Sequence, residues 1–254
     1  QLLAHGLRPF TLELDNFFVD RELTPRDETG NFDFEALETI NLPLFNDSLL
    51  RLTGGEQVQL PGFDFIHGKS TQGLLAQLSE NQIIIIEGIH GLNPALVTSV
   101  PADSIYRIYA SALTQLNVDA HNRVPTTDVR LLRRITRDAV QRGYSATDTI
   151  IRWPSVRRGE KRYIFPYQEN ADVMFNSTLV YELAALRPLA EPLLLQVERN
   201  TPYHIEAKRL LSFLSWVEPL QRSDFIPDNS ILREFIGGSI LDSYIPGQPS
   251  HNGC

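Results

Sequence analysis

The sequence has 254 residues, of which 42% are hydrophobic and 21% are charged, so it can fold around a sizeable core. Its formal net charge of -8 disfavours a general nucleic-acid-binding role, because such a surface repels polyphosphate backbones. The only cysteine is Cys254, which excludes an internal disulfide or cysteine-built metal site and fits a reducing, cytoplasmic setting. The longest aliphatic run, Ile83 to Ile86, is too short to span a bilayer, so we expect a protein without a membrane span.

Two predicted β-strands each end in an acidic residue. Thr11 to Leu14 alternate toward Asp15, which predicts a short strand that delivers this acid at its carboxyl end. The run Ile83 to Ile86 before Glu87 is typical of a strand buried on both faces of a parallel sheet. Ligands of open α/β sheets bind beyond the carboxyl ends of the strands, so both acids are candidates for binding a substrate or Mg²⁺. Each could also be structural; Asp15, for example, could cap a helix.

The remaining pattern alternates strands with helices. Further strands are predicted at Ile105–Ala110 and Asp172–Phe175. Helices are predicted over Asp128–Arg142, with Val129, Leu132, Ile135, Ala139 and Val140 on one face, over Ala146–Arg152, over Leu179–Glu198 with breaks at Pro188 and Pro192, over His204–Val217, and over a short stretch at Ser230–Phe235. This order predicts an α/β fold, a three-layer sandwich with a mainly parallel central sheet.

The segment Gly62 to Ser70 superficially resembles a phosphate-binding loop. It has five residues between its glycines where the Walker A motif has four, and Pro61 with two aromatic residues replaces the buried strand that should precede the loop. A surface hairpin is therefore the better interpretation.

Arginines recur at three- and four-residue steps in the helix predicted after Asp128. Such spacing places their guanidinium groups on one helix face, where planar forks can bind phosphoryl oxygens. The alternative is that Asp138 and other acids pair with them structurally. The residues with this spacing are Arg130, Arg133, Arg134 and Arg137, and Arg142 follows them in the same basic cluster.

Several short motifs occur in order along the chain: Asp15-Asn-Phe-Phe18, Asn31-Phe-Asp33, Phe63-Asp-Phe65, Ile86-Glu-Gly-Ile89, and Arg133-Arg-Ile-Thr-Arg137-Asp138 followed by Arg142-Gly143. Together they resemble the motifs of the uridine kinase and phosphoribulokinase family. Two further segments, Ser155-Val-Arg-Arg-Gly159 and Phe165-Pro-Tyr-Gln-Glu-Asn-Ala-Asp172, resemble a bacterial uridine kinase-like subgroup, in which the kinase follows a domain similar to the N-terminal part of threonyl-tRNA synthetase. The resemblance implies a P-loop NTPase-like fold of the nucleoside kinase type, with ATP and Mg²⁺ as cofactors.

The resemblance also implies roles for the acidic residues and for the substrate pocket. Asp15 would be the general base toward the acceptor hydroxyl and, with Glu87, would help to hold Mg²⁺. Asp33 would bind sugar hydroxyls. The remaining acceptor contacts would come from Phe18, Phe63 and His67.

For the arginines, the resemblance implies contacts to substrate and phosphate. Arg134 and Arg152 would bind substrate, and Arg137 would act in catalysis. Arg142 would contribute to catalysis and, with Arg133, to binding the nucleotide, as part of a mobile lid over about residues 140–165. The expected acceptor is a hydroxyl of a uridine- or cytidine-like nucleoside or of a related sugar. It need not be uridine itself, because Phe63 replaces a tyrosine and Arg152 a glutamine of uridine kinases.

The family's phosphate loop is not found in this sequence, and we expect it to precede residue 1, together with the first strand. The expected domains are a kinase core at residues 1–197, with a substrate hairpin at about 53–80, and a helical extension at 198–254. Without that loop, this chain by itself is expected to bind ATP poorly and to transfer phosphate hardly at all, and so to be inactive. The alternative function is a catalytically silent module that senses a nucleotide or tRNA end. Homo-oligomerisation stays open.

Overall fold

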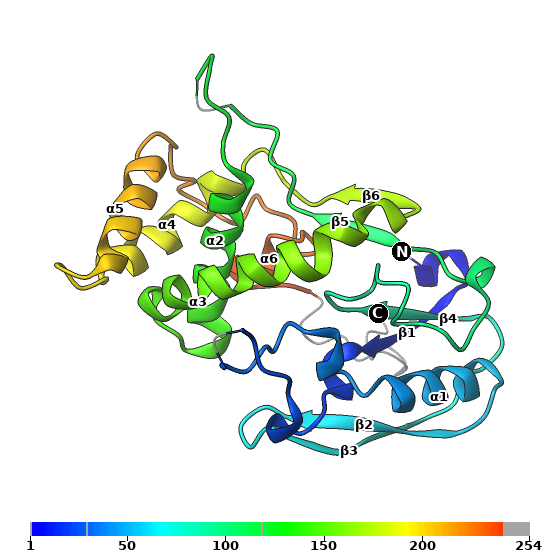
Figure 1. The fold of residues 1–254 in the computed structure, drawn as a ribbon. Helices are drawn as coiled ribbons and strands as arrows, with labels where there is room; N and C mark the ends of the chain where they lie inside the picture. Colours follow the sequence, from blue (N-terminus) through cyan, green and yellow to red (C-terminus); the bar gives the residue numbers. More distant parts are fainter. Residues whose placement is uncertain (1, 29, 118, 241–254) are drawn as a thin grey trace. The chain divides into compact units, whose positions relative to one another are not determined.

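The chain folds into two compact units, described by a computed structural model for residues 2–28, 30–117 and 119–240 (Figure 1). Within these ranges, the first unit contains the residues up to Tyr109 together with Arg158–Val173. The second contains Ala110–Arg157 and the residues from Met174 onward. This division does not follow the expected boundary at residue 197, because the later helices share a hydrophobic core with the arginine-bearing helix.

The first unit is built on two parallel strands. β1 (Arg8–Glu13) pairs with β4 (Gln82–Glu87) from Arg8 opposite Gln82 to Glu13 opposite Glu87, which confirms the α/β class with parallel strands. Ile84 and Ile86 pack against the core, whereas Ile83 and Ile85 are 40% and 38% exposed. The prediction that this strand is buried on both faces was therefore wrong in the described structure, since the pleat turns alternate side chains to a face that the core leaves partly exposed.

Helix α1 (Leu42–Thr53) packs in the core of the first unit and was not predicted. The Asn41 side chain accepts a hydrogen bond from the Leu44 N–H at 3.2 Å, and a proline lies in the first turn. Phe45, Leu49 and Leu52 recur at helical spacing and are buried. The N-cap followed by this apolar spacing was the signal that could have revealed the helix.

The Gly62–Ser70 segment is a β-hairpin, as predicted. β2 (Val58–Asp64) and β3 (Lys69–Ala76) are antiparallel. Lys69 donates to Asp20 and Glu22, each at 3.1 Å, and the Ser70 N–H donates to Asp20 at 2.9 Å. The lysine and the backbone amide that resembled a phosphate loop are thus engaged by carboxylates of the protein.

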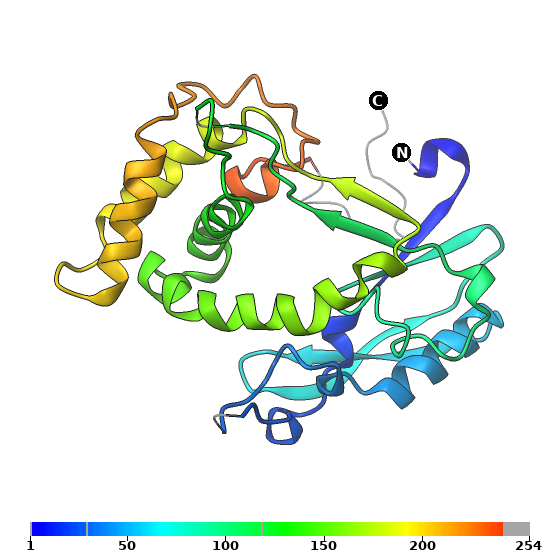
Figure 2. The ribbon, with the colours of Figure 1, turned by 45° about the horizontal axis from the view of Figure 1, so that its top comes forward.

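The remaining strands, β5 (Ile108–Ser111) and β6 (Val173–Asn176), form a third pair (Figure 2). Backbone hydrogen bonds join Arg107 to Asp172 and Val173, and Ser111 to Ser177, so both strands run in the same direction. β5 begins three residues later than predicted, and β6 begins one residue later. In the described residues the strands form three two-stranded sheets rather than one continuous sheet.

The second unit is helical. Its long helices are α2 (Thr126–Arg137), α3 (Ala146–Gly159, whose last two residues belong to the first unit), α4 (Glu182–Leu195) and α5 (Pro202–Leu214), with the short α6 (Arg233–Ile236). The hydrophobic core joins α2, α4, α5 and the segment around α6 through residues such as Leu132, Leu186 and Leu210. None of the helices in the described ranges is both long and apolar enough to cross a membrane.

Three helix predictions need correction. Helix α4 runs through Pro188 and Pro192 without a break, and α3 continues past Arg152 through Pro154. Val140, expected on the apolar face, is 68% exposed, because residues after α2 form a π-helical turn that changes the helical phase. Short 3₁₀ helices occur at Leu2–His5, Leu14–Phe17, Arg21–Leu23, Leu37–Thr39, Ala102–Ser104 and Phe165–Asn170, and π-helical turns at Asp138–Arg142 and Glu160–Ile164.

Candidate active site

Asp15 and Glu87 lie at the same end of the parallel strand pair. Glu87 ends β4 directly opposite Glu13, and Asp15 follows two residues later, in the 3₁₀ helix that begins where β1 ends. Both carboxylates are exposed. The predicted placement at adjacent strand ends is therefore confirmed, and the arrangement puts two acids where ligands of parallel sheets bind.

Gly88 makes the tight approach of these two strand ends feasible. Its φ is +151°, and a Cβ atom on it would come within 2.6 Å of the Leu14 Cδ1 atom. Leu14 itself is buried next to Asp15. The glycine after Glu87 thus lets the Leu14 side chain pack against the backbone, which fixes the start of the segment that carries Asp15.

Phe18 and Phe63 meet in an aromatic cluster with Phe65. Ring centroids are 5.6 Å apart for Phe18 and Phe63, 5.1 Å for Phe63 and Phe65, and 6.3 Å for Phe18 and Phe65, all near edge-to-face. The structure therefore brings two predicted substrate residues together and adds Phe65. A neighbouring pocket of about 170 Å³ is lined by Phe17, Phe18, Val19, Asp20, Leu23, Asn41, Leu44 and Ser70.

His67 lies at the exposed turn of the hairpin. Its Nδ1 atom is 2.5 Å from the Asp64 Oδ2 atom. The His67 ring, together with backbone N–H groups, holds the pKa of Asp64 below its usual value. The ring is thus oriented by a carboxylate, with its other nitrogen directed away from this contact.

Asp33 is bound by a residue that the sequence did not point to. The Tyr163 hydroxyl donates to the Asp33 Oδ2 atom at 2.6 Å, while the Glu35 N–H donates to Oδ1 at 3.2 Å. Burial and this carboxylate raise the pKa of Tyr163 to about 12, so the phenol stays protonated near neutral pH. Tyr163 is 130 residues from Asp33 in the sequence, and no local pattern could have paired them.

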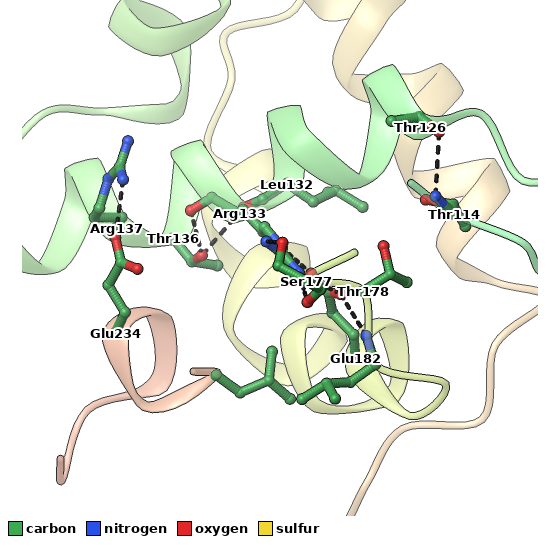
Figure 3. Close-up of polar contacts among 12 residues, drawn as sticks. Thr114, Thr126, Leu132, Arg133, Thr136, Arg137, Ser177, Thr178, Glu182 and Glu234 are labelled. Atoms are coloured by element: carbon green, nitrogen blue, oxygen red, sulfur yellow. Dashed lines mark hydrogen bonds and ion pairs between the residues drawn. The ribbon is translucent and has the colours of Figure 1, made fainter. Parts of the chain in front are cut away.

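Arg133 is a buried residue of the second unit. Its guanidinium donates to both carboxylate oxygens of Glu182, and to the Ser177 hydroxyl at 3.1 Å and carbonyl at 2.8 Å (Figure 3). Arg133 is 8% exposed and Glu182 is 1% exposed. The guanidinium that we predicted would bind the nucleotide is engaged within the protein, as the structural alternative anticipated.

The other predicted arginines of α2 and the turn after it are partly exposed. Arg134 lies 3.4 Å from the buried Asp138, which also accepts from Arg142 at 3.1 Å. Arg137 donates to Glu234 at 2.9 Å. Arg152, on α3, stacks over the Tyr144 ring at 4.3 Å. These arginines therefore combine contacts inside the unit with exposed guanidinium surface.

The carboxylates and aromatic residues of the candidate site all lie in the first unit, and the arginines lie in the second. Within the described residues, no group of three or more histidine, cysteine or acidic side chains could hold a metal ion by itself. Two carboxylates nonetheless fit Mg²⁺, which is usually bound by one or two carboxylates plus water and substrate phosphates.

The match to a family model shows to which protein family the chain belongs. Residues 9–184 match the model described as the phosphoribulokinase / uridine kinase family, which is more than half of the chain. The chain belongs to this family. Every residue of the predicted site, from Asp15 to Arg152, lies within the matched range, whereas α5 and α6 lie outside it.

Proteins similar to this chain include uridine kinases at low sequence identity. The uridine kinase of Saccharomyces cerevisiae is 28% identical over 171 residues, which cover 65% of this chain and 30% of that protein. The uridine kinase of Halobacterium salinarum is 25% identical over 166 residues, which cover 64% of this chain and 65% of that protein. The matches thus span less than two thirds of these relatives.

A solved structure of a possible uridine kinase from Bacillus stearothermophilus is also similar. It is 16% identical and covers 69% of this chain and 76% of its own, at a TM-score of 0.42. The family assignment rests on the sequence match to the phosphoribulokinase / uridine kinase model.

Proposed function

We propose that this chain is part of an ATP-dependent kinase that phosphorylates a hydroxyl group of a nucleoside or a related sugar. The observation that carries the proposal is the pair of exposed carboxylates, Asp15 and Glu87, at the shared carboxyl end of β1 and β4 in a member of a kinase family. Phosphoryl transfer needs mainly positioning and charge compensation, and acids at this edge can supply both.

Asp15 is the proposed general base. An exposed carboxylate at a strand end can accept the proton of an acceptor hydroxyl as its oxygen attacks the γ-phosphorus. Glu87 is proposed to hold Mg²⁺, directly or through water, with Asp15 as a second ligand. When bound, Mg²⁺ would compensate the negative charge of the phosphates.

The proposed acceptor site uses the remaining predicted residues of the first unit. Asp33 can accept a hydrogen bond from a sugar hydroxyl, and its contact with Tyr163 orients the carboxylate for this role. Phe18 and Phe63 offer aromatic surface to a flat base, and His67 offers a ring nitrogen. The hairpin of residues 53–80 would then be the substrate hairpin.

Arg134, Arg137 and Arg142 are the proposed phosphate-contacting residues of the second unit, and Arg152 is a proposed substrate contact. We leave Arg133 out of this set because its guanidinium is buried against Glu182 and Ser177. The arginines that we retain are partly exposed, as a planar fork must be to reach phosphoryl oxygens.

The experiment is a turnover screen of the complete natural protein with ATP, Mg²⁺ and a panel of nucleosides and free sugars. We expect ADP and one phosphorylated acceptor to form in equal amounts, with product dependent on Mg²⁺. ATP binding without product formation on any acceptor would contradict the proposal and favour a nucleotide-sensing role.

Arg142→Ala tests the proposed lid. Its guanidinium would stabilise charge on the transferring group more than it stabilises bound ATP. We therefore expect kcat to fall by about 10-fold or more and the affinity for ATP to fall by a smaller factor. Steady-state kinetics and equilibrium titration with ATP measure the two effects. The opposite ratio would remove Arg142 from catalysis.

A further inference from the structure

The segment around α6 packs on the arginine-bearing helix α2. The Glu234 carboxylate accepts from Arg137 Nη1 at 2.9 Å, and the Glu234 carbonyl accepts from Gln141 at 3.2 Å. The Phe235 ring lies 5.2 Å from the Arg133 guanidinium carbon. Figure 3 shows Glu234 pointing from α6 toward Arg137.

This segment is anchored in the core of the second unit. Leu232 is fully buried and Phe235 is 5% exposed, and both belong to the hydrophobic cluster that holds α2 and α4. Arg233 donates to several backbone carbonyls that surround α6, those of Pro227, Ser223, Ile226 and Gly237. Glu234 is therefore presented to Arg137 from a fixed support.

The Arg137 side chain is 28% exposed and that of Glu234 is 45% exposed. In the described residues, the buried Arg137 Nε atom has no hydrogen-bond partner, and Nη1 contacts Glu234. The contact between the Glu234 carboxylate and Nη1 restricts rotation of the Arg137 side chain, and the guanidinium has further N–H groups that can donate to a ligand.

We propose that Glu234 is a positioning residue that holds the Arg137 guanidinium in the orientation needed to bind a phosphoryl group. This rests on the proposed function, in which Arg137 contacts phosphate. A fixed guanidinium loses less conformational entropy when it binds than a mobile one does. Glu234 lies outside the family-matched residues 9–184, so the segment around α6 adds a supporting element to the family's arginine motif.

In an inhibitory role, Glu234 would compete with phosphate for Arg137, and its removal would raise activity and phosphate affinity rather than lower them. A competing segment must leave for the ligand to bind, but α6 is held by buried Leu232 and Phe235. The anchoring therefore favours positioning over competition.

The test uses the complete protein with Glu234→Ala, Glu234→Asp, Arg137→Ala and the Glu234→Ala/Arg137→Ala double variant. Glu191→Ala is the matched control, because Glu191 also pairs with an arginine, Arg187, at 2.9 Å in the same unit. We expect Glu234→Ala to lower kcat by about 10-fold, and Glu234→Asp to recover part of this loss. The double variant should equal Arg137→Ala, and Glu191→Ala should retain the wild-type rate.

A second readout separates this inference from the kinase proposal. Tripolyphosphate affinity, measured by calorimetry, requires no turnover, and Glu234→Ala should weaken it in the wild type and leave it unchanged in the Arg137→Ala background. That pattern supports positioning even if no acceptor is phosphorylated. The inference is overturned if Glu234→Ala has the same effect with and without Arg137, raises activity, or matches Glu191→Ala, or if Arg137→Ala binds tripolyphosphate like the wild type.

Discussion

Single residues decide how the two strand-end carboxylates are held. Leu14 is buried directly before Asp15, and Gly88 directly follows Glu87, with a backbone conformation that side chains rarely adopt. Leu14 and Gly88 therefore fix the backbone that carries Asp15 and Glu87. Neither Leu14 nor Gly88 has a chemical role in the proposed reaction, yet each fixes the backbone of a residue that does.

Gly88→Ala should disturb this support. The added methyl group would clash with Leu14, and the residue would be strained at φ +151°, so we expect a loss of about 1–3 kcal/mol in the free energy of unfolding. Urea unfolding followed by far-UV circular dichroism measures it. The control is Gly91→Ala, whose Cβ would have its nearest contact at an ordinary 3.5 Å. Equal stability of the two variants would contradict the proposed packing.

His90 gives the first unit a dependence on pH. It is 2% exposed, and burial lowers its pKa although Glu38 and Asp33 act in the opposite direction. As the pH falls through about 6.5, the unfolded chain takes up a proton that the folded chain resists, so stability falls by at most about 1.4 kcal/mol per pH unit.

His90→Gln should remove this part of the slope between about pH 7.5 and pH 5.5, measured by urea unfolding at both ends of the range. His5→Gln, at an exposed histidine of the same unit, should keep the wild-type slope. A His90→Gln slope equal to that of the wild type would show that another group causes the pH dependence.

Among the structural elements, those that depend on local patterns were predicted best. The strands before Asp15 and through Ile83–Ile86 were found because β-branched and alternating residues favour extended backbone, and the hairpin was found because its glycine spacing and flanks fail the phosphate-loop requirement. Strand order and pairing between segments that are distant in the sequence were harder to predict from the sequence. The pairing of β5 with β6, for example, joins residues more than 60 apart.

Helix ends and side-chain partners were predicted less well. The prolines at 188 and 192 were read as breaks, but α4 packs against α2 and α5, and tertiary burial of residues such as Leu186 and Leu194 outweighs the lost hydrogen bonds. The arginine spacing correctly predicted one α-helix for Arg130 to Arg137, but spacing could not reveal that Glu182, 49 residues away, pairs with the buried Arg133. Long-range partners such as Glu182, Tyr163 and Glu234 carry no local signal.

In the molecule as a whole, two hydrophobic cores support the two sets of side chains to which we propose functional roles. One core holds the strand ends with Asp15 and Glu87, and the other holds α2 with its arginines. The second core contains the buried Arg133–Glu182 ion pair, and removal of one partner would leave an uncompensated buried charge.

Arg133→Met should therefore destabilise the second unit by about 3–5 kcal/mol. Trp153 and Trp216 are the only tryptophans of the chain, and both lie in that unit, so intrinsic fluorescence during urea unfolding reports on it. Arg222→Met, which removes an exposed pair with Asp224, is the control and should change stability little. A stable Arg133→Met protein with weakened ATP binding would instead restore the predicted nucleotide contact.

Asp15 is the proposed base of a phosphoryl transfer reaction, and the turnover of Asp15→Asn in the complete protein measures this role directly. The amide keeps the shape of the side chain but cannot accept the proton, so kcat should fall by about 10²–10⁴-fold, while the circular dichroism spectrum and the ATP affinity measured without Mg²⁺ stay at wild-type values. Asp47→Asn, at an exposed carboxylate of α1, should leave kcat unchanged. Turnover of Asp15→Asn at the rate of Asp47→Asn would show that Asp15 is not the base.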